Sequence, residues 1–274
     1  MKNFPALDFP LSTDADPDRI LAAADDFSPT AVEERETGLR IFFDSPEVRR
    51  AALAALTQNG FAPLSVDVSD EDWARRSQEA LGPVTVGRVT VTPPWSPQPP
   101  VTSHQPPVTI VIAPSMGFGT GHHATTRLCL AALQTLDLSN RSVLDVGTGS
   151  GVLAIAAARL GATHALGIDN DPDAITAATE NLARNPQADG VTFRVADFTA
   201  SPLLPADVVT ANLTGTLLVR AARRLAALVS PGGTLIVSGL LAKEEPTVCA
   251  AFPSDVAWHA GEDGWVCVAF RMPH

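Results

Sequence analysis

The sequence predicts an α/β protein in which a small α+β domain precedes a larger, mostly parallel sheet with helices on both faces. A proline-rich stretch divides the chain at 92–107. After it, strand-like and helix-like segments alternate regularly, and the strands are nearly continuous apolar runs. Such runs are typical of parallel strands that are buried on both faces.

The dividing stretch reads TPPWSPQPPVTSHQPP. Prolines at this density remove backbone donors and fix φ, so neither a helix nor an interior strand forms there. We interpret 92–107 as a semi-rigid linker between a domain at 1–91 and a domain at 108–274.

The first domain alternates strands with amphipathic helices, which indicates a small, ferredoxin-like α+β unit. Ser45 is placed to cap one helix, which Asn59 and Gly60 end. No group of residues in this domain resembles a catalytic site. The expected strands are 4–11, 31–35, 39–43, 61–68 and 84–91, and the expected helices are 16–26, 46–57 and 70–81.

The second domain shows the repeated β-α order of a Rossmann-like fold with a seven-stranded sheet. Ligands of such sheets bind beyond the carboxyl ends of the strands, so chemistry is expected there. The expected strands are 108–112, 142–146, 164–168, 191–195, 207–211, 234–238 and 265–270, and the helices are 125–136, 152–160, 171–185, 217–229 and 243–252.

Composition excludes several classes of protein. The formal net charge is -11. This argues against a protein that binds nucleic acid through its phosphates, because such binding needs a basic face. The charge suits a basic protein substrate, or solubility alone. No apolar run reaches membrane-spanning length and no signal peptide is apparent, so we expect a cytoplasmic enzyme.

The strongest motif is VLDVGTGSG at 143–151, an apolar strand followed by alternating glycines and a helix. Gly147 and Gly149 allow a sharp turn and close approach of a ligand to the backbone. The spacing differs from the G-x-G-x-x-G of dinucleotide sites, because Val152 occupies the place of the last small residue. Asp145 near the strand end suits a cationic ligand that bears an amine.

Two further acids follow the next strands. Asp169 lies about twenty residues beyond the glycines, where a carboxylate can accept hydrogen bonds from both ribose hydroxyls. Asp197 is placed to accept a hydrogen bond from an adenine amine, and Phe198 to cover the ring. Together with the glycine motif, these acids indicate an adenosyl ligand.

This ordered set resembles the class I methyltransferases, which use S-adenosyl-L-methionine. The segment MGFGTGHHATT at 116–126 resembles the loop before the first core helix of the PrmA family, the enzymes that methylate ribosomal protein L11. VTANL at 209–213 is similar to that family's fourth strand, where an Asn projects into the active site, and the segments 71–74 and 91–95 resemble its first half and linker.

The resemblance implies cofactor contacts at Thr126, Gly147, Asp169 and Asn212. Asn212 is the candidate catalytic residue, because its amide oxygen can accept from the acceptor amine and orient it.

In the loop and its flank, Phe118, Thr120 and His123 are candidates for substrate contacts. Although His122 and His123 are adjacent, the sequence offers no third ligand at helix spacing, so we expect no metal site.

The implied function is protein N-methylation of lysine side-chain and/or N-terminal amines, on a basic ribosomal protein docked by the small domain. The alternative is a class I methyltransferase that acts on another protein or on a small molecule. We expect a monomer that binds neither nucleic acid directly nor a membrane.

Overall fold

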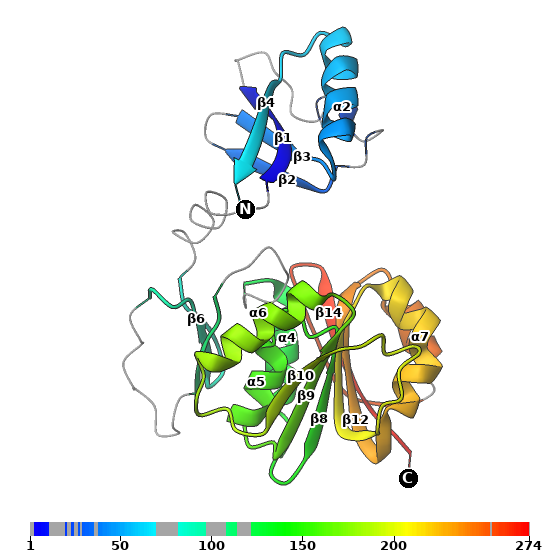
Figure 1. Ribbon diagram of the computed structural model, residues 1–274. Coiled ribbons are helices and arrows are strands. Elements are labelled where there is room, and N and C mark those ends of the chain that lie inside the picture. The colour runs from blue at the N-terminus through cyan, green and yellow to red at the C-terminus, as the bar shows by residue number, and fades with distance from the viewer. Residues whose placement is uncertain are drawn as a thin grey trace. The chain divides into compact units, whose positions relative to one another are not determined.

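The computed structural model describes residues 3–10, 20, 23–24, 27, 29–35, 38–69, 82–96, 108–113, 122–252 and 254–273 (Figure 1). The predicted helix 70–81, most of the linker, and Phe118 and Thr120 lie outside the described residues. The chain divides into two compact units, Met1–Ala80 and Leu81–His274, and each is described by itself.

The first unit holds an antiparallel sheet with the order β2-β3-β1-β4. This order, with α2 between β3 and β4, is that of a ferredoxin-like fold. Ser45 accepts a hydrogen bond from the backbone N–H of Val48 (3.3 Å) and caps α2, as predicted. The elements are β1 (Asn3–Pro10), β2 (Ala31–Arg35), β3 (Gly38–Phe42), α2 (Pro46–Gln58) and β4 (Leu64–Ser69).

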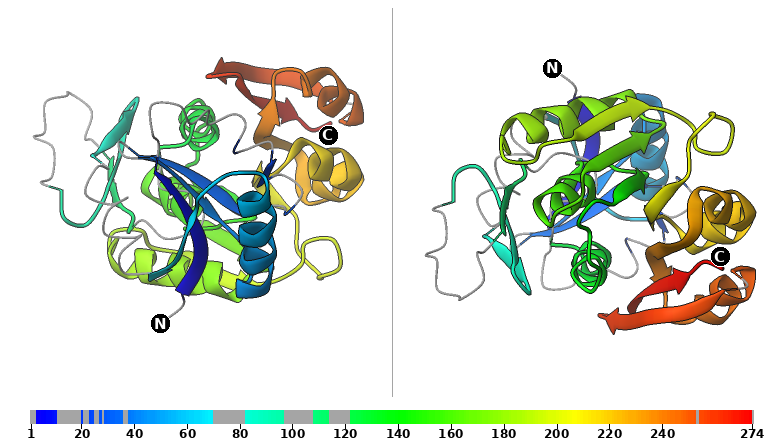
Figure 2. Two further views of the ribbon diagram at one scale, coloured as in Figure 1. Left: turned by 90° about the horizontal axis from the view of Figure 1, so that it is seen from above. Right: turned by 90° about the horizontal axis from the view of Figure 1, so that it is seen from below.

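The second unit contains a seven-stranded sheet with the order β10-β9-β8-β11-β12-β14-β13. The first five strands in this order are parallel, and β14 and β13 run antiparallel at one edge, where Figure 2 shows them in red and orange. The strands are β8 (Ser142–Val146), β9 (His164–Asp169), β10 (Val191–Val195), β11 (Ala206–Asn212), β12 (Val229–Leu241), β13 (Asp255–Glu262) and β14 (Trp265–Arg271).

Helices cover both faces of this sheet, which confirms the predicted Rossmann-like class (Figure 1). Successive strand residues point to opposite faces. Val143 therefore packs in the cluster with α4 and α5, whereas Leu144 packs in the cluster with α7 and α8. The helices are α4 (Ala124–Leu133), α5 (Val152–Arg159), α6 (Pro172–Ala183), α7 (Gly215–Ala227) and α8 (Glu245–Ala251).

The strand expected at 108–112 does not join the main sheet. As β7 (Val108–Val111) it pairs with β6 (Val89–Thr92), which forms a hairpin with β5 (Val84–Val86). The single strand expected at 84–91 is thus interrupted by a turn, where Gly87 has φ +55°. All three strands belong to the second unit, whereas the sequence placed 84–91 in the first.

The seventh strand of the main sheet is β13, which is absent from the strands expected from the sequence. Its sequence, DVAWHAGE, lacks the continuous apolar run expected of a buried strand. Its residues are exposed or half-buried. It is recruited by pairing with β14 at the sheet edge. Strand β12 also extends beyond the predicted 234–238 at both ends.

Candidate cofactor and acceptor site

The glycine motif forms a tight turn between β8 and α5. Gly147, Gly149 and Gly151 all have positive φ, at +69°, +52° and +82°. L-residues with side chains rarely adopt this left-handed conformation. The backbone N–H groups of Gly147 and Thr148 both donate to the Ile168 carbonyl of β9 (2.9 Å each), so the turn is fixed to the neighbouring strand.

Asp145 lies beneath this turn rather than on its open side. Its side chain is buried, and its two oxygens accept hydrogen bonds from the hydroxyls of Thr148 and Thr210 (2.6 Å each). Burial raises the pKa of Asp145, and the two hydroxyls act in the opposite direction. This differs from the expected contact with a cationic ligand, because the buried carboxylate is held by Thr148 and by Thr210 of the adjacent strand. Asp145 supports the turn from below.

Asp169 ends β9 beside the turn and is half-buried. Its Oδ2 accepts from the backbone N–H of Gly149 (3.0 Å), and its Oδ1 accepts from the N–H of Asp171 (3.1 Å). The register pairs Asp169 with Val195, the last residue of β10. The carboxylate thus lies at the carboxyl edge of the sheet, where a ribose-binding acid was expected.

Asp197 follows β10 and is exposed. Its Oδ1 accepts from the hydroxyl (2.7 Å) and backbone N–H (2.8 Å) of Thr199, and these bonds lower the pKa of Asp197. Phe198, expected to cover an adenine ring, is instead buried in the apolar cluster beneath α7 and α8. Arg224 of α7 donates to the Phe198 carbonyl (2.8 Å) and holds this segment against the helix.

Asn212 is the last residue of β11 and is half-buried. Its Nδ2 donates to the hydroxyl of Thr125 at the start of α4 (3.1 Å). The glycine turn lies close by, since a Cβ on Gly147 would come 2.6 Å from the side chain of Leu213. The structure therefore brings the end of β11, the glycine turn and the start of α4 to one edge of the sheet.

Strand β12 makes room for the end of β11. Its pairing with β14 shifts register between Ser238 and Leu240, which places a bulge at Gly239. Gly239 has φ +87°, and a Cβ there would lie 2.3 Å from the carbonyl oxygen of Leu213. Bulges are common beside active sites, where they redirect the backbone.

Helix α4 begins with His123 as its N-cap, whose side chain accepts from the backbone N–H of Thr125. Thr126, a predicted cofactor contact, is buried in the first turn. Arg127 fixes this helix end, because it donates to the carbonyl of His122 and pairs with Glu262 at the end of β13 (2.8 Å).

Two asparagines, Asn181 in α6 and Asn185 just beyond the end of this helix, contribute to the site region, and the sequence motifs do not include them. Asn181 is buried, accepts from the N–H of Ala113 (2.9 Å) and donates to the Ser150 carbonyl in the glycine turn (3.0 Å). Asn185 makes hydrogen bonds to both backbone groups of Val111. Asn185 follows the end of α6, and its Nδ2 also donates to the Asn181 carbonyl (2.7 Å). The i, i+4 spacing of the two asparagines was the available signal.

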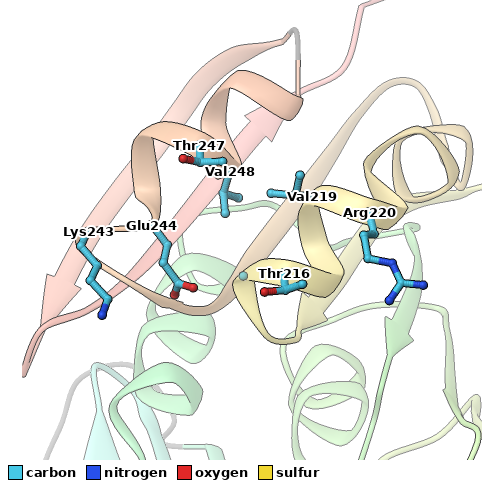
Figure 3. A pocket seen from close by; sticks show the side chains of 8 residues that line it. Thr216, Val219, Arg220, Lys243, Glu244, Thr247 and Val248 are labelled. Atoms are coloured by element: carbon cyan, nitrogen blue, oxygen red, sulfur yellow. The ribbon is translucent and has the colours of Figure 1, made fainter.

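A cavity of about 500 Å³ lies between the start of α7 and α8 (Figure 3). Val219 and Val248 point toward one another across it, and Glu244 extends toward the start of α7. The Glu244 carboxylate accepts from the N–H of Leu241 (2.8 Å). The cavity begins at Gly215, three residues after Asn212. Its lining residues are Gly215, Thr216, Val219, Arg220, Lys243, Glu244, Thr247 and Val248.

None of the described helices is long and apolar enough to cross a membrane. Within the same part of the chain, no three His, Cys, Asp or Glu side chains gather as metal ligands would.

Known proteins match nearly the whole chain. Residues 27–273 match the family described as Ribosomal protein L11 methyltransferase (PrmA). The chain is 41% identical over 268 residues to Ribosomal protein L11 methyltransferase of Geobacter sulfurreducens, covering 91% of this chain and 87% of that relative. It is also 41% identical to the protein of the same name from Deinococcus radiodurans, covering 80% of this chain and 78% of that relative.

A solved structure shows the same relationship. It is a ribosomal protein L11 methylase from Lactobacillus delbrueckii subsp. bulgaricus, with a TM-score of 0.65 and 26% identity, and the match covers 71% of this chain and 100% of that one. The strand-end residues thus belong to a fold shared with a methylase, and the sequence match extends from the small unit to the last strand. This chain belongs to the PrmA family of ribosomal protein L11 methyltransferases.

Proposed function

We propose that this enzyme transfers methyl groups from S-adenosyl-L-methionine to lysine side-chain and/or N-terminal amines of ribosomal protein L11. One observation carries the proposal. In a chain of this family, the left-handed glycine turn, the carboxylate of Asp169 and the amide of Asn212 lie at the carboxyl edge of one parallel sheet.

The turn fits the adenosyl cofactor. Gly147 and Gly149 have positive φ and carry no side chain. A ligand can therefore approach the backbone of the turn closely. Asp169 offers carboxylate oxygens to the ribose hydroxyls, Asp197 accepts from the adenine amine, and Thr126 contacts the cofactor from α4. When bound, S-adenosylmethionine supplies a methyl group on a sulfonium, which is an excellent leaving group.

Asp145 acts on the cofactor through the turn. Its carboxylate holds the Thr148 hydroxyl from below, so it keeps the loop in shape without touching the ligand.

Asn212 prepares the acceptor. An amide oxygen accepts a hydrogen bond from an amine N–H and turns the amine's lone pair toward the methyl carbon. A lysine amine has a pKa of about 10.4 and an α-amine about 8. Burial beside a cation favours the neutral, nucleophilic form of either amine. The enzyme's main contribution is alignment, and the amine's proton passes to water.

The remaining residues serve the protein substrate. The small unit docks L11, and His123, Phe118 and Thr120 contact the segment that carries the acceptor. The net charge of -11 attracts a basic ribosomal protein. The enzyme acts as a monomer in the cytoplasm, where a ribosomal protein is available, without binding nucleic acid directly.

Transfer of labelled methyl groups to purified L11, beside a second basic ribosomal protein as control, tests the substrate. We expect label on L11 alone. Label on other proteins or on small molecules would favour another methyl acceptor.

Calorimetry with S-adenosylhomocysteine and with a nicotinamide dinucleotide tests the cofactor separately. Heat with the dinucleotide and none with S-adenosylhomocysteine would end the proposal.

A further inference from the structure

The orientation of Asn212 depends on Thr125, which follows the helix cap His123 at the start of α4. Thr125 is 4% exposed and accepts a hydrogen bond from Asn212 Nδ2 at 3.1 Å. We propose that Thr125 is a positioning residue, which holds the Asn212 amide with its oxygen toward the methyl acceptor. The inference rests on the proposed function and deepens it.

The direction of the hydrogen bonds follows from the donors. The Asn212 amide nitrogen only donates, so the Thr125 oxygen accepts from it. Nδ1 of His123 accepts from the backbone N–H of Thr125, so it carries no proton. The Thr125 hydroxyl therefore donates to this nitrogen, at 2.8 Å. His123 is itself held by an edge-on contact with Trp265, whose ring centroid is 4.9 Å away. A continuous chain of contacts therefore links β14 to the amide of Asn212.

Fixing the nitrogen also fixes the oxygen, because the two atoms of an amide lie on opposite branches. The oxygen of Asn212 lies beside Gly239, where a Cβ would come 3.0 Å from it. The absence of a side chain at this bulge leaves room for the oxygen. Thr125 and Gly239 therefore flank Asn212 on its two sides.

This orientation matters for the chemistry. An amide oxygen accepts from the N–H of the acceptor amine and leaves the amine's lone pair available for the methyl carbon. A reversed amide would instead donate to that lone pair and occupy the electrons that form the new bond. Thr125 opposes the reversal, because its proton is committed to His123 and its oxygen presents a lone pair to Asn212.

Substitutions at Thr125 test the effect of its hydroxyl apart from the effects of its size and its backbone N–H. Thr125→Val keeps the size of the side chain and keeps the backbone N–H that His123 caps. Thr125→Ser keeps the hydroxyl. Thr90→Val is a matched control, since Thr90 is also 4% exposed and has a threonine hydroxyl as partner, but lies on β6 in the separate sheet.

Steady-state methylation of L11 is measured for these variants. For Thr125→Val we expect kcat to fall by roughly 10- to 100-fold, with little change in the KM for L11 or in the affinity for S-adenosylhomocysteine. Thr125→Ser and Thr90→Val should stay near the wild-type rate.

A double substitution tests whether Thr125 acts through Asn212. Thr125→Val should add no further loss to Asn212→Ala. Unchanged kcat in Thr125→Val, a serine variant as slow as the valine variant, or additive losses would each overturn the inference.

A second measurement is independent of activity. With 15N-asparagine labelling, the side-chain amide of Asn212 is identified as the signal lost in Asn212→Ser. Its protons should exchange slowly with solvent in the wild type and in Thr125→Ser, and faster in Thr125→Val. If the wild type fails to methylate L11, the proposed function is wrong. Amide exchange still tests whether Thr125 holds the Asn212 amide, because it does not depend on activity. Equal exchange in all three proteins overturns the inference.

Discussion

At the scale of single residues, Gly239 has two constraints that an added methyl group would violate. It combines φ +87° with a Leu213 carbonyl 2.3 Å from the position of a Cβ. A backbone carbonyl cannot move aside as a flexible side chain does, so the end of β11 would have to shift. Asn212 would move with it.

We therefore expect Gly239→Ala to lower the free energy of unfolding by more than the roughly 1–3 kcal/mol of left-handed strain alone, and to reduce methyl transfer. Urea unfolding and L11 methylation check both. Gly264→Ala is the control, because Gly264 has φ +77° but nothing within 4 Å of a Cβ. Equal destabilisation by the two substitutions would show that the clash with Leu213 contributes nothing.

Asp169 is the residue whose charge the cofactor is proposed to use. Asp169→Asn should weaken binding of S-adenosylhomocysteine by about tenfold or more, because a hydrogen bond to a charged group contributes about 1.5–3 kcal/mol. Calorimetric titration measures the change. Asp173→Asn, an exposed acid in the first turn of α6, should bind like the wild type. Unchanged affinity in Asp169→Asn would remove this carboxylate from the site.

At the scale of elements, a carboxylate joins the start of β8 to the start of β11. Asp207 Oδ2 accepts from both the backbone N–H and the hydroxyl of Ser142 (2.8 Å each). These hydrogen bonds, the one from the backbone foremost, lower the pKa of Asp207, and the nearby Arg141 acts in the same direction. The two strands that carry Asp145 and Asn212 are thus held together at their starting ends.

The lowered pKa of Asp207 makes the stability of the fold depend on pH in a definite direction. The ionised form of Asp207 binds its partners in the folded state, so its contribution is present above the unfolded pKa of about 3.9 and is lost as the pH falls through the folded value. Asp207→Asn should therefore be less stable than the wild type at neutral pH, and the difference should shrink in acid. Urea unfolding across the pH range tests this, and a difference that does not depend on pH would contradict it.

At the scale of the whole molecule, the position of β6 decides where the chain can be cut. Val89 and Val91 of β6 are buried in the core of the second unit, and β6 pairs with β7. A cut before Thr92, at the predicted linker, removes β6 and leaves the β7 edge unpaired. A cut before Leu81, at the observed division, keeps the three-stranded sheet.

We expect residues 81–274 to fold and to bind S-adenosylhomocysteine, and residues 92–274 to be less stable or insoluble. Both should lose L11 methylation, since the proposed docking unit is absent. Circular dichroism, calorimetry and methylation assays check the three expectations. Equal stability of the two fragments would contradict the role of β6, and full activity of residues 81–274 would contradict docking by the small unit.

The fold class, the order of most elements and the edge of the sheet where the site lies could all be predicted from the amino-acid sequence. These features depend on local patterns. The alternation of strands and helices predicts a parallel sheet, and the carboxyl ends of parallel strands meet at one edge. Gly147, Asp169 and Asn212 each follow or end a strand, so their shared location could be read from the chain. Strand β13 is an exception, because it lacks an apolar run and forms through pairing with β14.

The direction and the contacts of individual side chains near the site could not be predicted, because they depend on how the elements pack. Asp145 turns inward because Thr210 of the adjacent strand meets it there, and Phe198 is buried because α7 covers it. Thr125 reaches Asn212 only because α4 packs beside the end of β11. In all three cases the partners are distant in sequence. Their contacts exist only once the chain has folded, so local patterns could not indicate them.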